Sequence, residues 1–127
     1  MENKRQLQMA ETVKRHFSEV LQREGYLIYG SGPLVTVTNV KISPDLSQAT
    51  VYLSVYNVAS KETVIESISH NASRLRQSLA SRTRRHMRRV PYLEFHLDEL
   101  LDEMEKVDNL FDRLYAENQM GSGEEEE

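Results

Sequence analysis

The stretch "LVTVTNVKISPDLSQATVYLSVYN", residues 34–57, carries the strongest signal for the fold. Both of its halves are rich in β-branched and aromatic residues, which are typical of strands. The "SPDLSQ" segment between them supplies Ser, Pro and Asp, which favour turns, so the stretch predicts an antiparallel hairpin. The second strand alternates cleanly, with Val51, Leu53 and Val55 on one face and Tyr52, Ser54 and Tyr56 on the other. We expect these tyrosines to pack beneath a helix rather than to serve as stacking platforms for bases.

The first strand of the hairpin changes phase part-way along its length. Its apolar residues form two sets of opposite parity, Val35 with Val37 and Val40 with Ile42. Either both faces of the strand are partly covered, or a bulge near Asn39 shifts the register.

Helical periodicity lies on both sides of the hairpin. Apolar residues recur at three- and four-residue steps from Leu7 to Leu21, and Gly25 follows them, as at many helix ends. After the hairpin, Ser60 can cap a second helix. Its apolar spacing runs to about residue 88, which is long for a small domain, so we expect a kink inside it. Pro91 marks its end, because the residue before proline is pushed out of the helical region.

The remaining sequence predicts one more strand and one more helix. "YLEFHL", residues 92–97, alternates as a third strand, and Asp98 can cap a last helix with an acidic outer face. That helix has an apolar stripe formed by Leu100, Leu101, Met104, Val107, Phe111 and Leu114. The order α-β-β-α-(α)-β-α predicts an α+β fold with a three-stranded sheet and helices on one face. We expect one domain at residues 3–117 and a disordered acidic tail at 118–127.

Composition and motifs argue against several classes of protein. The chain has no cysteine, which excludes disulfides, thiol catalysis and Cys-type zinc sites. It has no run of about 20 apolar residues and no apolar leader at its start, so we expect a cytoplasmic monomer without a membrane partner. No phosphate-binding glycine motif occurs, and the four histidines lack metal-ligand spacing. We therefore expect neither an enzyme nor a bound metal or cofactor.

The formal net charge of −4 conceals a strong segregation of charge. Residues 1–66 balance seven basic against seven acidic side chains, whereas residues 67–93 hold seven arginines and no acid. Residues 94–127 hold thirteen acidic side chains and two basic ones. This segregation, and not the average charge, indicates the kind of partner.

The segment "NASRLRQSLASRTRRHMRRV", residues 71–90, holds all seven of these arginines. On a helical wheel of about 100° per residue, six of them lie opposite the leucines. Only Arg76 lies among the apolar residues, which indicates a break in the helix nearby. Like charges on one face repel, and a phosphate backbone would relieve that repulsion. The predicted nucleic-acid surface comprises Arg74, Arg82, Arg84, Arg85, Arg88 and Arg89, helped by Lys4, Arg5, Lys14 and Arg15.

Several segments together resemble the ribosome-binding factor A family over nearly all of residues 3–117. They are "LQRE" at the end of the first helix, the hairpin with "SPDL" and "A-x-VYLS", "R-x-x-P-x-L-x-F-x-x-D" from Arg88 to Asp98, and "DNLFDRL" at 108–114. The resemblance implies a type II KH-like fold with a terminal helix. It also implies a factor, not an enzyme, that binds the free small (30S) ribosomal subunit and its 16S rRNA and assists late rRNA maturation and processing.

The family interrupts its helix at an Ala-x-Gly kink, and the matching residues here are Ala72, Ser73 and Arg74. Arginine thus replaces the glycine, and Asn71, which tolerates unusual dihedral angles, is expected to take part of its role.

Three other interpretations remain open at this stage. The acidic last helix can fold back and neutralise the arginines. The protein can be a general KH-like RNA-binding or regulatory protein that is not tied to the ribosome. It can also be a protein-interaction module whose acidic helix binds a basic partner.

Overall fold

The computed structural model describes residues 2–100 and 114 of the chain. Its elements are α1 (Lys4–Glu24), α2 (Tyr26–Tyr29), β1 (Leu34–Ile42), β2 (Gln48–Tyr56), α3 (Lys61–His70), α4 (Ala72–Thr83) and β3 (Tyr92–Leu97). The predicted order is confirmed over this range, with the short helix α2 as an addition. Most of the expected last helix and the whole expected tail at 118–127 lie outside the described residues.

The three strands form a mixed sheet in the order β1-β2-β3. Strand β1 runs antiparallel to β2, and β3 runs parallel to β2. The register of the hairpin shifts between Val37 and Asn39, so of the two interpretations left open by the sequence, the bulge near Asn39 is the correct one. Because Thr38 is the extra residue, Val37, Val40 and Ile42 all reach the buried face despite their different parity. The Thr38 hydroxyl donates to Asp98 Oδ2 at 2.6 Å, which ties the bulge to the end of β3.

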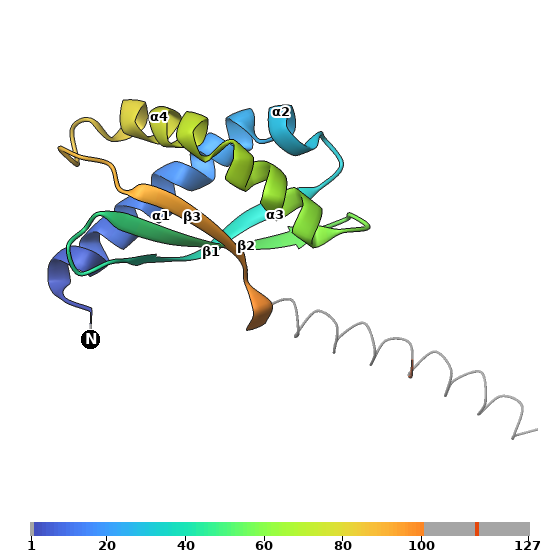
Figure 1. Ribbon diagram of the computed structural model, residues 1–127, viewed down its shortest axis with the longest axis horizontal. Coiled ribbons are helices and arrows are strands. Elements are labelled where there is room, and N and C mark those ends of the chain that lie inside the picture. The colour runs from blue at the N-terminus through green and yellow to red at the C-terminus, as the bar shows by residue number, and fades with distance from the viewer. Residues whose placement is uncertain (1, 101–113, 115–127) are drawn as a thin grey trace, which may run out of the picture.

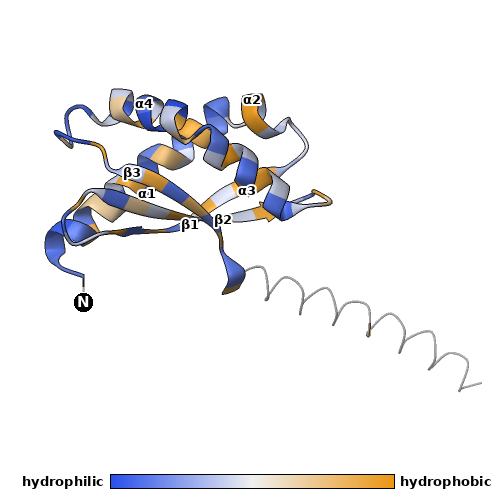
Figure 2. Cartoon of the chain, viewed as in Figure 1, coloured by the Kyte–Doolittle hydropathy of each residue, from blue (hydrophilic) through white to orange (hydrophobic). Residues whose placement is uncertain are grey.

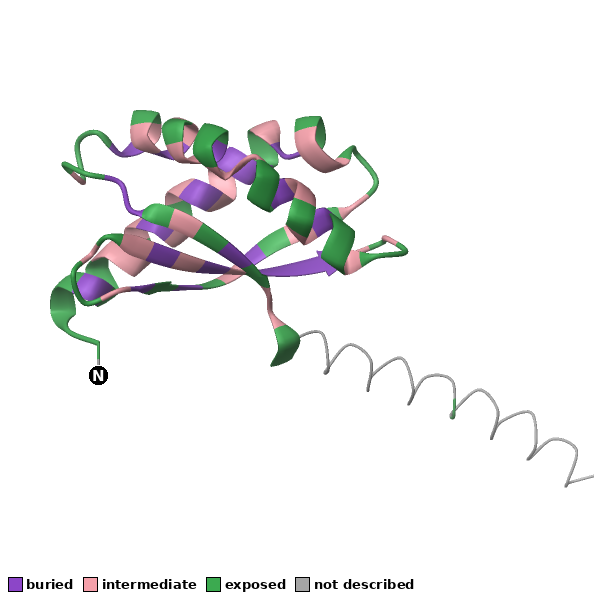
Figure 3. Ribbon diagram, in the orientation of Figure 1, coloured by how far each residue is buried: buried purple, intermediate pink, exposed green. Residues whose placement is uncertain are grey.

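The helices cover one face of the sheet, and the core fills the space between the two layers (Figures 1 and 2). Phe17 of α1 and Phe95 of β3 meet there with their ring centroids 5.4 Å apart. Leu75 and Leu79 anchor α4 in the core, and both are fully buried. Figure 3 shows buried and less buried positions alternating along the first part of β2, as expected of a sheet covered on one side, and the end of β2 is buried throughout from Leu53 to Val55.

The predicted burial of two tyrosines beneath a helix is wrong. Tyr52 and Tyr56 are only half-buried, because the fully buried alternate positions of β2 already face the helices. The tyrosines therefore lie on the other face of the sheet, where Tyr52 packs against the ring of His96 with the centroids 6.1 Å apart. On the same face, Lys61 Nζ lies 5.5 Å from the ring centroid of Tyr56.

Helix α1 is held at both ends by specific contacts. Asn3 Oδ1 accepts from the Gln6 N–H and Gln6 Oε1 accepts from the Asn3 N–H, both at 2.9 Å, which is a capping box. Gly25 follows the helix, as predicted, but with ordinary right-handed dihedral angles. A Cβ at this position would collide with the Tyr29 hydroxyl, so glycine is required for space rather than for a left-handed backbone.

The expected kink lies at Asn71, between α3 and α4. Asn71 has φ −104° and ψ 14°, outside the helical values, and its N–H donates to Ile68 O. Its side-chain Nδ2 donates to Ser67 O at 2.8 Å, which satisfies a carbonyl at the end of α3. The kink is therefore present without glycine at residue 74, since Arg74 lies within the first turn of α4.

Helix α4 ends at Thr83, so the predicted extension to about residue 88 is wrong. The Thr83 carbonyl accepts from the N–H groups of His86 and Met87 in a closing turn. After Leu75, Leu79 and Thr83 the fully buried series stops: Arg84, Arg85 and His86 are exposed, and Met87 is only partly buried. Residues 84–91, called here the arginine loop, instead return the chain to β3, which must begin beside Gln48.

Candidate nucleic-acid interface

Four of the predicted site residues project from the arginine loop. Arg84, Arg85, Arg88 and Arg89 are all exposed, whereas Val90 and Pro91 at the end of the loop are buried. Among the described residues, no carboxylate forms an ion pair with these four guanidinium groups. In Figure 3 the loop is an exposed edge beyond the end of α4. The result is a dense positive surface, without an ion-pair partner among residues 2–100, on a loop with an anchored end.

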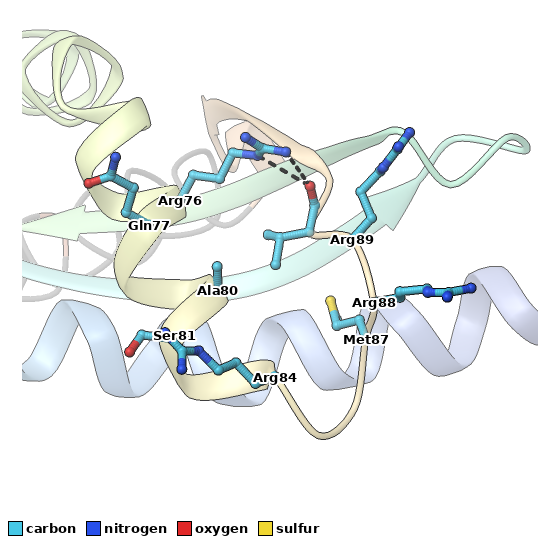
Figure 4. Close-up of a pocket in the computed structure, with 9 residues that line it drawn as sticks. Arg76, Gln77, Ala80, Ser81, Arg84, Met87, Arg88 and Arg89 are labelled. Atoms are coloured by element: carbon cyan, nitrogen blue, oxygen red, sulfur yellow. Dashed lines mark hydrogen bonds between the residues drawn. The ribbon is translucent and has the colours of Figure 1, made fainter.

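Arg76 is the anchor of that loop. Its Nη2 donates to Val90 O at 2.7 Å, and its Nε lies 3.2 Å from both Val90 O and Pro91 O. The guanidinium also stacks over the ring of Tyr92, 4.3 Å from the centroid. Figure 4 shows this side chain reaching from α4 to the end of the loop. The unusual position of Arg76 on the helical wheel thus reflects a structural contact that sequence reasoning did not identify.

Arg82 is bound within the protein and differs in this from the loop arginines. Its guanidinium forms an ion pair with Glu19 of α1, and its side chain is only 25% exposed. The hydrogen bond from Arg82, followed by its charge, lowers the pKa of the Glu19 carboxyl. Arg82 therefore joins α4 to α1, and its contact with nucleic acid stays a prediction.

Helix α1 brings Arg5 and the ring of His16 to the arginine loop. Arg5 lines a hollow together with His86, Arg88 and Arg89, and Asp45 contributes a carboxylate to the same hollow. Further along α1, the ring of His16 packs against that of His86 at 5.3 Å, and Arg15 Nη2 lies 3.5 Å from His16 Nε2.

The local environment of His16 disfavours protonation of its imidazole. Burial, followed by the charges of Arg15 and His86, lowers the pKa of His16.

The other predicted residues do not join this group. Lys4 is exposed in the first turn of α1. Lys14 follows Arg5 by nine residues, so the helical period places it on the side of α1 opposite to Arg5. Arg74 lies at the kink with its Nε 4.0 Å from Glu24 Oε1. At about 1.5 Å per residue, α4 separates Arg74 from Arg84 by roughly 15 Å. The structure thus divides the predicted site between the two ends of α4.

A hollow of about 600 Å³ lies between α4 and the arginine loop. Ala80, Met87 and Val90 contribute apolar surface to it. Arg84 lines it from the start of the loop, and Arg88 and Arg89 lie on the part of the loop that leads to β3 (Figure 4). Across the residues that the structure describes, no cluster of side chains suited to a metal ion occurs, and no helix is long and apolar enough to span a membrane.

A three-stranded sheet, helices on one face and an interrupted α3–α4 pair define a KH-like domain, here with an arginine-rich edge. The sequence model of the family described as "Ribosome-binding factor A" matches residues 5–111. Ribosome-binding factor A of Flavobacterium johnsoniae is 35% identical over 109 residues, covering 86% of this chain and 84% of the relative. Ribosome-binding factor A of Chlorobaculum tepidum is 37% identical over 99 residues, covering 73% of this chain and 82% of the relative. The chain belongs to the ribosome-binding factor A family.

Solved structures agree with this assignment. The crystal structure of ribosome-binding factor A from Thermus thermophilus aligns with a TM-score of 0.60 and 29% identity, covering 72% of this chain and 94% of that one. A homology model of the Thermus thermophilus factor, fitted into the cryo-EM map of its complex with the 30S subunit, aligns with a TM-score of 0.55 and 33% identity. This alignment covers 68% of this chain and 88% of that one. A Thermotoga maritima homologue, at 19% identity and a TM-score of 0.57, shares the fold. The predicted KH-like fold is confirmed.

Proposed function

We propose that this protein binds the free small (30S) ribosomal subunit and its 16S rRNA through the arginine loop, and that it assists late rRNA maturation in the cytoplasm. It would act by binding alone, without catalysis. Family membership supports this proposal, as does the 30S complex of the Thermus thermophilus relative. The observation that carries it is the set of four exposed arginines without a carboxylate partner among the described residues.

Arginine suits this task for two physical reasons. Its planar guanidinium binds a phosphate through two parallel hydrogen bonds, and each phosphate that is neutralised releases condensed counterions. A domain that holds several such groups on an anchored loop binds best to an rRNA arrangement whose phosphates match their spacing. Such a factor shifts the rRNA toward that conformation by the difference in its affinity for the two states.

The direct test is co-sedimentation with small subunits over a range of salt concentrations. The Arg88→Glu/Arg89→Glu variant should lose at least tenfold in affinity and should show a weaker dependence on salt. Arg82 is left unchanged because it holds α1. The matched control is Arg23→Glu/Lys41→Glu, which changes the net charge equally at exposed positions that do not line the hollows beside the loop. Equal losses in the two variants would refute a specific role for the loop.

Competition separates ribosome binding from general RNA binding. An excess of an unrelated structured RNA should leave most of the protein on the subunit. Complete displacement at equal phosphate concentration would instead favour a general RNA-binding protein. For the maturation step, cells that produce only the Arg88→Glu/Arg89→Glu variant should accumulate precursor 16S rRNA, whereas cells with the control variant should not.

A further inference from the structure

The hollow between α4 and the arginine loop has a combination of surfaces that phosphate binding alone does not require. Its volume of about 600 Å³ lies within the range of roughly 300–1,000 Å³ typical of small-ligand sites. Ala80, Met87 and Val90 form apolar surface, while Arg84, Arg88 and Arg89 add positive charge. A site for phosphates alone has no use for apolar surface, so the lining indicates a ligand with both an apolar part and a negative part.

The hollow is preformed, because both ends of the loop are fixed. At its far end, the Arg76 guanidinium holds Val90 O and Pro91 O and stacks over Tyr92. At its near end, Thr83 O accepts from the N–H groups of His86 and Met87, each at 2.9 Å. Fixed walls reduce the entropic cost of binding, since little of the loop must be ordered when the ligand arrives.

Polar groups at the edge of the hollow complete the match to a nucleotide. Gln77 and Ser81 line it from successive turns of α4, and both side chains are exposed. An amide and a hydroxyl offer donors and acceptors to the edge of a base. In a duplex each base is stacked and paired, so only an unpaired nucleotide can present its base to such a site.

We propose that this hollow receives one unstacked base of single-stranded RNA, with the adjoining phosphates bound by Arg84 on one side and by Arg88 and Arg89 on the other. The inference rests on the proposed function and narrows it to a single-stranded segment of the rRNA. The site lies at the C-terminal end of α4, at the opposite end of the helix from the kink at Asn71. The full-length protein would thus bind RNA at a position distinct from the kink.

The test uses a short RNA with 2-aminopurine at its centre, presented either as a single strand or within a duplex. Wild-type protein should bind the single strand at least tenfold more tightly and should change its 2-aminopurine fluorescence, since only the single strand can place an unstacked base in the hollow. The Ala80→Leu variant, which narrows the hollow, should lose that preference and the fluorescence change while still binding the duplex. The Arg88→Gln/Arg89→Gln variant should weaken binding of both RNAs.

A second variant tests the hollow independently, so that the result does not depend on correct folding of Ala80→Leu. Gln77→Ala/Ser81→Ala changes only exposed side chains and should reduce the preference several-fold with unchanged thermal unfolding. Equal affinity of wild-type protein for the two RNAs would overturn the inference, as would a preference that both hollow variants retain. Either result leaves the proposed function standing as long as the protein still co-sediments with small subunits, whereas loss of that co-sedimentation would refute the function itself.

Discussion

At the N-terminal end of α4, Arg74 lies 4.0 Å from Glu24, whereas at the C-terminal end Arg84, Arg85, Arg88 and Arg89 have no ion-pair partner among the described residues. Glu24 also accepts a hydrogen bond from Ser78 Oγ at 3.0 Å, so the kink end carries its own counter-charge. The two ends have the same residue type in different electrostatic surroundings. A phosphate at the loop end has no described carboxylate within ion-pair distance of the arginines to compete with, so the loop end is the stronger candidate for RNA binding.

Between these ends, the arginines of α4 serve the structure. Arg76 binds the backbone at the end of the arginine loop, and Arg82 binds Glu19 of α1. Their donors are occupied in holding other elements in place. Within residues 71–90, some arginines therefore hold the fold together and others form an exposed surface. Variants of each kind should have different effects.

The largest effect should come from weakening the core packing of α4, which holds both ends of this helix in place. Leu79 is fully buried, and Leu79→Ala should lower the free energy of unfolding by about 2–5 kcal/mol, because it leaves a cavity in the core. Urea denaturation measures the loss. Ser73→Ala at an exposed position of the same helix should change stability by less than about 0.5 kcal/mol. Similar values for the two variants would contradict the packing described for α4.

A smaller and more local effect is expected when the anchor of the loop is removed. Arg76→Met keeps the length of the side chain but loses its hydrogen bonds to Val90 O and Pro91 O, so the arginine loop should become mobile. Hydrogen exchange of the amides at 84–90 should accelerate, and affinity for small subunits should fall about tenfold, roughly 1.4 kcal/mol. Arg74→Met at the kink end should leave exchange in the loop unchanged. If Arg76→Met also leaves it unchanged, Arg76 does not position the loop.

Local patterns predicted most of the fold, because local physics determines them. The strand alternation predicted the hairpin, and the phase change near Asn39 indicated either a bulge or two partly covered faces, of which the structure has the bulge. The excessive length of the predicted helix indicated a kink, which lies at Asn71. The end of α4 could not be predicted in this way. A wheel accommodates Arg84 to Arg89 as a helical face, whereas the parallel pairing of β3 with β2 requires the chain to turn back after Thr83.

The site was harder to predict than the fold, because free and occupied arginines are identical in sequence. Glu19 lies 63 residues before Arg82, and Val90 lies 14 residues after Arg76. Such partners become visible only when α1, α4 and the loop are placed in space. The composition did identify the segment that holds the surface, since a run of arginines without acid is uncommon in a solvated helix face.

Acid should destabilise the folded protein through His16, whose ring packs against that of His86 in the arginine loop. The pKa of His16 is lowered by burial, followed by the charges of Arg15 and His86, so the folded protein binds a proton at this imidazole less readily than the unfolded chain does. An unfolded histidine takes up a proton below a pH of about 6.5, and the unfolded state then gains relative stability. Stability should therefore decrease as the pH falls from about 7 to 5, and His16→Gln should reduce that decrease. Thermal unfolding at several pH values measures it, with His70→Gln as the exposed control. An equal pH dependence in both variants would exclude His16 as the cause.

The smallest effect concerns the origin of the kink. Arg74→Gly introduces the glycine of the family's Ala-x-Gly motif, but residue 74 already has a helical backbone within α4. The substitution should therefore cost only about 0.5–1 kcal/mol of helix stability and should leave the kink angle unchanged. Asn71→Ala removes the hydrogen bond from Asn71 Nδ2 to Ser67 O and should cost about 1 kcal/mol while altering the amide chemical shifts of residues 67–72. Larger shifts from Arg74→Gly than from Asn71→Ala would place the origin of the kink at residue 74. The expected result assigns it to the residue that lies between the two helices, because the asparagine side chain supplies the hydrogen bond that the interrupted helix lacks.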